Sequence, residues 1–216
     1  MYVPEHFSLK ENGQAFGLIE QIRLGTLVAM SPDPDIAAFQ ATHIPFMVDR
    51  NRGDKGVLIG HVARANPHAH AMRDGDKVLA VFLGPAAYVS PSWYHTAPRA
   101  PTWIYVSVQA QGRVTLVTAP AALKEMVLRL CDESEPSSTG WRSRDLPDSF
   151  VDRLINGIVG FEIEIDSLEG AARLGQNNDL EDRRRVARAL ADGEGQQPIT
   201  RLMHSVLKSE AVNAKG

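Results

Sequence analysis

The stretch WIYVSVQAQGRVTLVT, residues 103–118, decides the fold class that the sequence predicts. Its first part, Trp103–Ala110, has the residue pattern of a β-strand, and Arg113–Thr118 has it again. Gly112 separates the two parts, so we expect a β-hairpin here. An antiparallel β-structure is therefore the starting point for the rest of the chain.

Other short strands and several helices surround this stretch. Pro45 favours an edge or a bulge in its strand, and Thr118 is expected to cap the helix that begins at Pro120. The further strands are expected at Thr26–Met30, Thr42–Val48, Val57–Gly60, Lys77–Leu83 and Gly160–Ile165, and the helices at Asn12–Arg23, Pro120–Cys131, Phe150–Ile158, Asn178 or Asp179 to Ala191, and Pro198–Ser209. The order predicts a mainly β fold with α additions, a small barrel rather than a βαβ sheet.

Composition limits the class of protein. The chain has 216 residues, 44% of them hydrophobic, and a formal net charge of -3, so a DNA-binding role is not supported by net charge and would need a local basic patch. The single cysteine excludes an internal disulfide and favours a reducing compartment. The N-terminus has no secretory-signal pattern, and no apolar run reaches a membrane span, so we expect a cytoplasmic protein with no membrane partner.

The segment GHVARANP, residues 60–67, is rich in candidate binding groups. A strand is expected to end at Gly60, and GHVARANP then forms one helical turn that Pro67 ends. Free backbone N–H groups at the start of that turn, with the fork of donors that Arg64 adds, suit a phosphate. The alternative is that Arg64 pairs with a local acid and His61 is a buried, hydrogen-bonded side chain.

A second segment concentrates aromatic residues between positions 88 and 105. Ser90, Ser92 and Thr102 are interleaved with them, and this mixture of aromatic walls and hydroxyl donors suits a planar heteroaromatic ligand. The alternative is an ordinary hydrophobic core. The aromatic residues are Tyr88, Trp93, Tyr94, Trp103 and Tyr105.

In order along the chain, these segments resemble the PaiB family of FMN-binding transcriptional regulators. The motifs that carry the resemblance are MYVPEHF at the start, GHVARANP, GPAAYVSPSWY at 84–94, PTWIY at 101–105 and RLGQN at 173–177. The resemblance implies an FMN-binding split β-barrel that works as a homodimer, with the flavin in a groove at the two-fold interface. It assigns residues 1–178 to this domain, with helical insertions, and 179–216 to a C-terminal helical extension.

Site residues follow from placing the family's groove on this chain. Arg64 is the phosphate candidate, and the ring and ribityl region fall to the aromatic segment. The complete predicted set is Thr42, His43, His61, Arg64, Asn66, Ser90, Trp93, Tyr94, Thr102, Trp103, Gln176 and Asn177. No catalytic residue is assigned, because a bound flavin would itself supply redox chemistry.

Three positions depart from the family pattern. Ile104 replaces the asparagine of PTWNY, and Gly175 and Asn178 replace a serine and a basic residue in the late motif. These changes predict weaker flavin binding or a different ligand, with haem as the alternative cofactor.

Two functions remain open: an FMN-binding regulator, and an enzyme that is either an FMN-dependent oxidoreductase or haem-handling. The weaker signals predict neither metal nor DNA binding. His68 and His70 form an incomplete metal pair. Arg183, Arg184, Arg185 and Arg188 are offset by acidic neighbours and predict a solvated helix face.

Overall fold

A computed structural model describes residues 1–35, 37–192 and 198–213, including side chains up to residue 207. It divides into two compact units. Unit 1 contains Met1–Glu11, Leu83–Val108 and the chain from Glu169 onward, and unit 2 contains Asn12–Phe82 and Gln109–Leu168. The domain boundary expected at residue 178 stays a prediction, and residues 193–197 and 214–216 of that extension lie outside the described residues.

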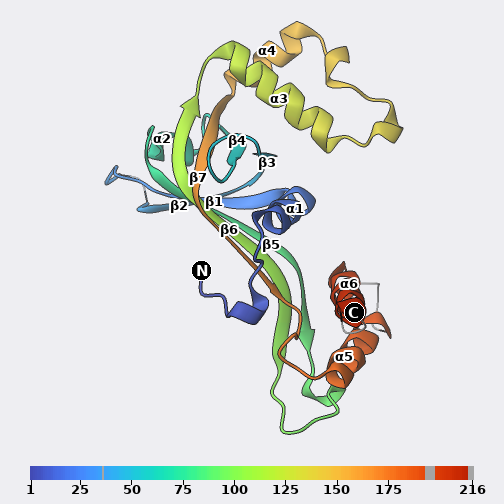
Figure 1. Cartoon of the computed structure of the whole chain (residues 1–216). Coiled ribbons are helices and arrows are strands. Elements are labelled where there is room, and N and C mark those ends of the chain that lie inside the picture. The colour runs from blue at the N-terminus through green and yellow to red at the C-terminus, as the bar shows by residue number, and fades with distance from the viewer. Residues whose placement is uncertain (36, 193–197, 214–216) are drawn as a thin grey trace. The chain divides into compact units, whose positions relative to one another are not determined.

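Seven strands form one sheet in the order β2-β1-β5-β6-β7-β4-β3 (Figure 1). Four pairings with a described register, β1 with β2 and β5, and β4 with β3 and β7, are antiparallel. β5, β6 and β7 are long and have residues in both units. The strand bounds are β1 Leu24–Met30, β2 Phe39–Pro45, β3 Met47–Asp49, β4 Val57–Ala63, β5 Lys77–Val89, β6 Thr102–Val117 and β7 Ile158–Arg173. The predicted mainly β fold with helical additions is confirmed.

The helices of the described residues are α1 Asn12–Ile22, α2 Pro67–Ala71, α3 Pro120–Ser134, α4 Asp148–Asn156, α5 Leu180–Asp192 and α6 Pro198–Asn213, with short 3₁₀ turns at Glu5–Phe7, Pro91–Trp93, Ser137–Thr139 and Ser143–Asp145. All but α2 lie near their predicted places, and α2 was not predicted. Asp179 caps α5 as predicted, since its Oδ1 accepts the N–H of Asp182 at 2.8 Å. Thr118 does not cap α3: the N-cap is Ala119, without a side-chain hydrogen bond.

The hairpin predicted at residues 103–118 is wrong. β6 runs through Gly112 without a turn. A Cβ at Gly112 would lie 2.0 Å from the carbonyl oxygen of Glu164, so this glycine allows β7 to approach closely. The glycine therefore marks a close contact between strands rather than the end of one.

Other boundaries also differ from the prediction. The predicted strand Thr42–Val48 breaks at Phe46, just after Pro45 ends β2, because proline has no N–H to donate. β5 continues past Leu83 to Val89, where the sequence indicated a loop. Helix α4 stops at Asn156, and Ile158 already begins β7.

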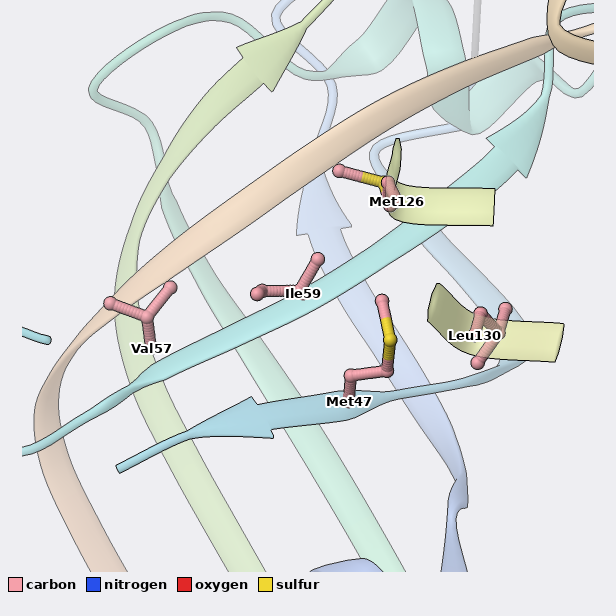
Figure 2. Close-up of a cluster of buried hydrophobic side chains, with 5 residues drawn as sticks. All are labelled: Met47, Val57, Ile59, Met126 and Leu130. Atoms are coloured by element: carbon pink, nitrogen blue, oxygen red, sulfur yellow. The ribbon is translucent and has the colours of Figure 1, made fainter. Parts of the chain in front are cut away.

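Unit 2 has an aromatic centre and a helical cover. Phe46 lies edge-on to Phe82 and Phe161, with ring centroids 5.1 and 6.1 Å apart. On the other side of β4, α3 contributes Met126 and Leu130 to a cluster with strand residues, as Figure 2 shows. The strand members of that cluster are Met47, Val57 and Ile59. α3 and α4 also pack against each other, so unit 2 is a sheet with one face closed by a helical pair.

Candidate functional site

Unit 1 contains a cavity of about 260 Å³ built from two stretches of chain that are far apart in the sequence. One stretch runs from Tyr94 to Ile104 and the other from Arg173 to Asn178. The lining residues are Tyr94, Pro98, Arg99, Ala100, Thr102, Trp103, Ile104, Arg173, Gly175, Asn177 and Asn178. We call this cavity the Arg173 pocket. It brings together the predicted site residues Tyr94, Thr102, Trp103 and Asn177.

Aromatic side chains give this pocket exposed apolar walls. Trp103 is 57% exposed, although it packs edge-on against Tyr88 with the ring centroids 6.1 Å apart. Burial raises the pKa of Tyr94, and the nearby Arg99 charge opposes that rise. Ile104 is buried, so the position where the family has an amide is apolar here. The aromatic segment is thus neither wholly core nor wholly pocket.

The Arg99 side chain is hydrogen-bonded to three residues and lies over the ring of a fourth. Its guanidinium donates to Thr96 Oγ1, to Asp182 Oδ2 at 2.5 Å and to Asn178 Oδ1 at 2.8 Å. It also lies over the ring of Tyr94, 4.7 Å from the centroid. Its charge is paired with the Asp182 carboxylate, so Arg99 shapes the wall more than it attracts an anion.

Arg173 is the other cation of the pocket, and its charge is available. Its guanidinium lies 5.4 Å from the centroid of the Phe7 ring and makes no hydrogen bond or ion pair with any residue described in the structure. An arginine fork of this kind matches phosphate and carboxylate groups. The pocket can therefore bind an anion beside an aromatic wall.

The late motif folds as a tight turn that closes the pocket. Gly175 has φ of +83°, a left-handed conformation that glycine adopts readily, and Asn178 N–H donates to its carbonyl at 2.9 Å. The Gln176 side chain accepts from Leu174 N–H at 2.8 Å and donates to the Ala172 carbonyl at 2.6 Å. Gln176 thus braces the turn, and Asn177 lines the cavity.

Two further predicted residues of unit 1 lie in the neighbouring 3₁₀ turn. Ser90 Oγ accepts the N–H of Ser92 at 3.3 Å and also contacts the Ser92 hydroxyl, so it caps the turn. The carbonyl of Trp93 accepts from Arg185 Nε at 3.2 Å. Ser90 and Trp93 are outside the lining of the Arg173 pocket.

The five remaining predicted residues belong to unit 2. Thr42, Asn66 and the fully buried His68 form a hydrogen-bonded group: Thr42 Oγ1 lies 3.0 Å from His68 Nδ1 and accepts from Asn66 Nδ2 at 3.2 Å. Asn66 Oδ1 accepts the N–H of His68, which caps α2. We call these three residues the Asn66 network. Burial lowers the pKa of His68, so its imidazole is held neutral.

His43 lies on the opposite face of β2 from Thr42, because neighbouring strand residues point to opposite sides. Its Nδ1 is 2.8 Å from Thr26 Oγ1, directly across the β1–β2 pair. The same face carries Leu24, Met30 and Phe39, which are 60 to 68% exposed. His43 thus sits within an exposed apolar surface of the sheet.

His61 and Arg64 correct the prediction for GHVARANP. The strand does not end at Gly60: β4 continues to Ala63, and α2 begins, rather than ends, at Pro67. Arg64 donates from Nε and Nη2 to the carbonyls of Asn156 and Ile158, at 3.0 and 2.8 Å, and it forms no ion pair with an acid among the residues that the structure describes. His61 has a buried Nδ1 without a hydrogen-bond partner in the structure, and burial lowers its pKa. The turn therefore lies at residues 64–66 rather than directly after Gly60, and the phosphate site expected here stays a prediction.

Arg99, Arg173 and Asp182 are the residues that sequence reasoning missed. Arg173 opens the RLGQN motif, so the motif itself pointed to it, whereas nothing local marks Asp182. The arginine stripe on α5 is only partly solvated: Arg184, Arg185 and Arg188 are exposed, and Arg183 is buried. Among the residues that the structure describes, no group of three or more potential ligands is placed to hold a metal, and no helix has the length and hydropathy needed to cross a membrane.

Comparison with known proteins gives this geometry a context. Residues 1–167 match the family described as "Putative FMN-binding domain". The chain is 27% identical to the protease synthase and sporulation protein PAI 2 of Bacillus subtilis, over 97% of this chain and 100% of that protein. It is also 32% identical to an uncharacterized protein of Emericella nidulans, over 77% and 80% of the two chains.

Solved structures confirm the fold. A flavocytochrome from Azotobacter vinelandii superposes with a TM-score of 0.60 at 15% identity, covering 85% of this chain and 78% of that one. An FAD- and haem-binding protein from Mycobacterium smegmatis gives 0.58 at 16% identity, covering 91% and 96%. The predicted split β-barrel and the resemblance to the PaiB family are both confirmed, and the family that the chain matches is described as FMN-binding.

Proposed function

The chain belongs to the FMN-binding domain family that its residues 1–167 match, and from that premise we propose that it binds FMN in the Arg173 pocket and acts as a cytoplasmic, homodimeric regulator of the PaiB type. The proposal is supported by the guanidinium of Arg173, which has no hydrogen bond or ion pair among the described residues and lies in a cavity that Tyr94 and Trp103 also line.

The side chains of this pocket match the parts of FMN. Arg173 is suited to the phosphate, whose oxygens accept paired hydrogen bonds from a guanidinium. Thr102 and Asn177 offer the hydroxyl and amide groups that ribityl oxygens bond, and the exposed face of Trp103 suits a planar ring. When bound, the flavin would supply redox chemistry that side chains lack. The chain's own contribution is to hold and orient it.

The size of the cavity supports a dimer. Pockets that enclose a drug-sized ligand have volumes of about 300–1,000 Å³. The cavity here is about 260 Å³, so one chain would leave part of an FMN molecule uncovered. A second copy that covers the remainder accounts for this difference.

The exposed face of β1 and β2, in unit 2, is the surface that we assign to contact between two copies. Met30 and Phe39 are paired across the two strands, and Leu24 lies further along the same face. Monomeric proteins seldom leave large contiguous apolar surface exposed, and a two-fold interface would bury it against itself. Sedimentation of a Met30→Gln/Phe39→Gln variant tests this: we expect monomers where the wild type forms dimers, and a monomeric wild type contradicts the proposal.

A regulatory role rests on the similarity to PAI 2 and on charge. The net charge of -3 opposes general nucleic-acid binding, so any DNA contact must be local. Arg184, Arg185 and Arg188 on α5 are the exposed basic group that would supply it. Retention on promoter DNA that falls steeply with salt would support direct binding, and no retention at low salt would restrict the role to regulation through a partner.

An enzyme is the second candidate, because the flavocytochrome and the FAD- and haem-binding protein share the fold. Consumption of NAD(P)H with added FMN would favour a flavin-dependent oxidoreductase. A Soret band in the purified protein would favour haem.

The deciding experiment is the absorption spectrum and mass of whatever copurifies, followed by titration of the ligand-free protein with FMN. We expect flavin absorption and quenching of FMN fluorescence on binding. A protein that neither copurifies with flavin nor quenches added FMN contradicts the proposal.

A further inference from the structure

Helix α5 carries a fully buried carboxylate, that of Asp182, in its first turn. Four donors from residues 95–99 surround it. Oδ1 accepts the N–H groups of His95 and Thr96, at 2.5 and 3.2 Å. Oδ2 accepts the Thr96 hydroxyl and Arg99 Nη2, both at 2.5 Å.

A buried charge is tolerated only when it is paired and hydrogen-bonded, and this one is both. Burial by itself would raise the pKa of Asp182. The hydrogen bonds from Thr96, His95 and Arg99 outweigh burial and lower the pKa to about 2. The carboxylate is therefore ionised wherever the protein is folded at ordinary pH.

The two carboxylate oxygens have different tasks. Oδ1 ties α5 to the backbone of residues 95 and 96. Oδ2 holds the Arg99 side chain, which in turn lies over Tyr94 and donates to Asn178, and all three of these residues line the Arg173 pocket. Asp182 itself is outside the lining.

We propose that Asp182 is a positioning residue of the Arg173 pocket: it fixes Arg99 as part of the pocket wall and compensates its charge, which leaves Arg173 to attract the anionic ligand. The inference rests on the proposed function, because the ligand it serves is the flavin phosphate. It extends the site to a helix that the matched residues 1–167 do not include.

Asp182→Asn separates the two tasks. The asparagine keeps an oxygen for the two backbone N–H groups, but its NH₂ group faces the Arg99 donors and releases them. We expect FMN affinity to fall about tenfold, the size of one lost hydrogen bond to a charged group. Glu181→Gln is the matched control, since it removes a carboxylate charge from the same turn of α5 at an exposed position. That variant should keep its FMN affinity.

A double-mutant cycle with Arg99→Ala distinguishes positioning from a general loss of stability. If Asp182 acts through Arg99, the double variant binds FMN no more weakly than Arg99→Ala alone, because the shared interaction is already gone. Independent losses that multiply to about a hundredfold would overturn the proposal, and so would wild-type affinity in Asp182→Asn.

A readout without flavin keeps the two proposals separable. In the wild type, Arg99 Nε donates to Thr96 Oγ1 at 2.9 Å, so its N–H resonance should be protected from solvent exchange. We expect that resonance to be lost in Asp182→Asn, and its retention would overturn the positioning role whatever the flavin result. If the resonance is lost and the wild type does not bind FMN, the proposed function fails while the hold on Arg99 stands.

Discussion

The two regions that the sequence marks as binding sites use their polar groups in opposite ways. In unit 2, the side chains around GHVARANP bond mainly to the chain itself: Arg64 holds two carbonyls, and Asn66 caps a helix. In unit 1, the wall of the Arg173 pocket is braced by Asp182 and Gln176, and Arg173 is left without a hydrogen bond or ion pair among the described residues. A motif rich in donors therefore indicates a ligand only where the fold leaves those donors unused.

The largest expected effect is that of Arg173→Ala on FMN binding. Removing a guanidinium that makes two charge-assisted hydrogen bonds to a phosphate should weaken affinity about a hundredfold. Fluorescence titration with FMN measures it, and Arg188→Ala, an exposed arginine on α5, is the control. An Arg173→Ala variant that binds FMN as tightly as the wild type would remove the pocket from the proposal.

Arg64→Ala tests the other region, and we expect an FMN affinity within about twofold of the wild type and a lower Tm. Nε and Nη2 of Arg64 hold two backbone carbonyls, so their loss should reduce the free energy of unfolding, by about 1 kcal/mol per bond, rather than the affinity for the ligand. The same FMN titration, run beside a thermal melt, checks both parts. An unchanged titration excludes Arg64 from the site, and a loss larger than that of Arg173→Ala would reverse the comparison.

Local sequence patterns predicted the features of the fold that depend on neighbouring residues in the chain. The start of α1 at Asn12, and the start and cap of α5, follow from residues within a few positions of one another. The hairpin prediction was wrong because the role of Gly112 depends on a distant residue: the glycine allows the backbone of Glu164, on another strand, to approach closely. The ion pair of Arg99 with Asp182 spans 83 positions, and no local signal marks it.

In the candidate site, too, the sequence predicted the location of residues but not the contacts that they make with distant parts of the chain. The RLGQN and SPSWY motifs led to the pocket's neighbourhood, and four predicted residues line it. The specific roles did not follow, because whether an arginine is free depends on which carbonyls and carboxylates the fold brings to it. Arg64 and Arg173 have the same chemistry in the sequence and differ only in their partners.

Asn66→Ala is expected to act on stability. It removes the cap of α2 and the donor to Thr42, so the free energy of unfolding should fall by about 1 kcal/mol, which lowers Tm by roughly 2–4 °C. Asn66→Asp keeps the capping oxygen and should recover most of the loss. FMN affinity measured well below Tm then tests whether Asn66 also binds the ligand. A decrease in affinity in both variants would mean that Asn66 contacts the flavin.

The smallest expected effect is a pH dependence of stability that comes from unit 2. Burial lowers the pKa of His61 and His68 below their usual value near 6.5, so both stay neutral in the folded protein while the unfolded chain takes up protons. Their contribution to stability is therefore complete above about pH 6.5 and declines as the pH falls through the lowered values. Thermal melts between pH 8 and 5 measure this, and His68→Gln should flatten the decline where His204→Gln, at an exposed position on α6, leaves it unchanged. If the decline in His68→Gln were as steep as in the wild type, the acid sensitivity of stability would have to arise outside the Asn66 network.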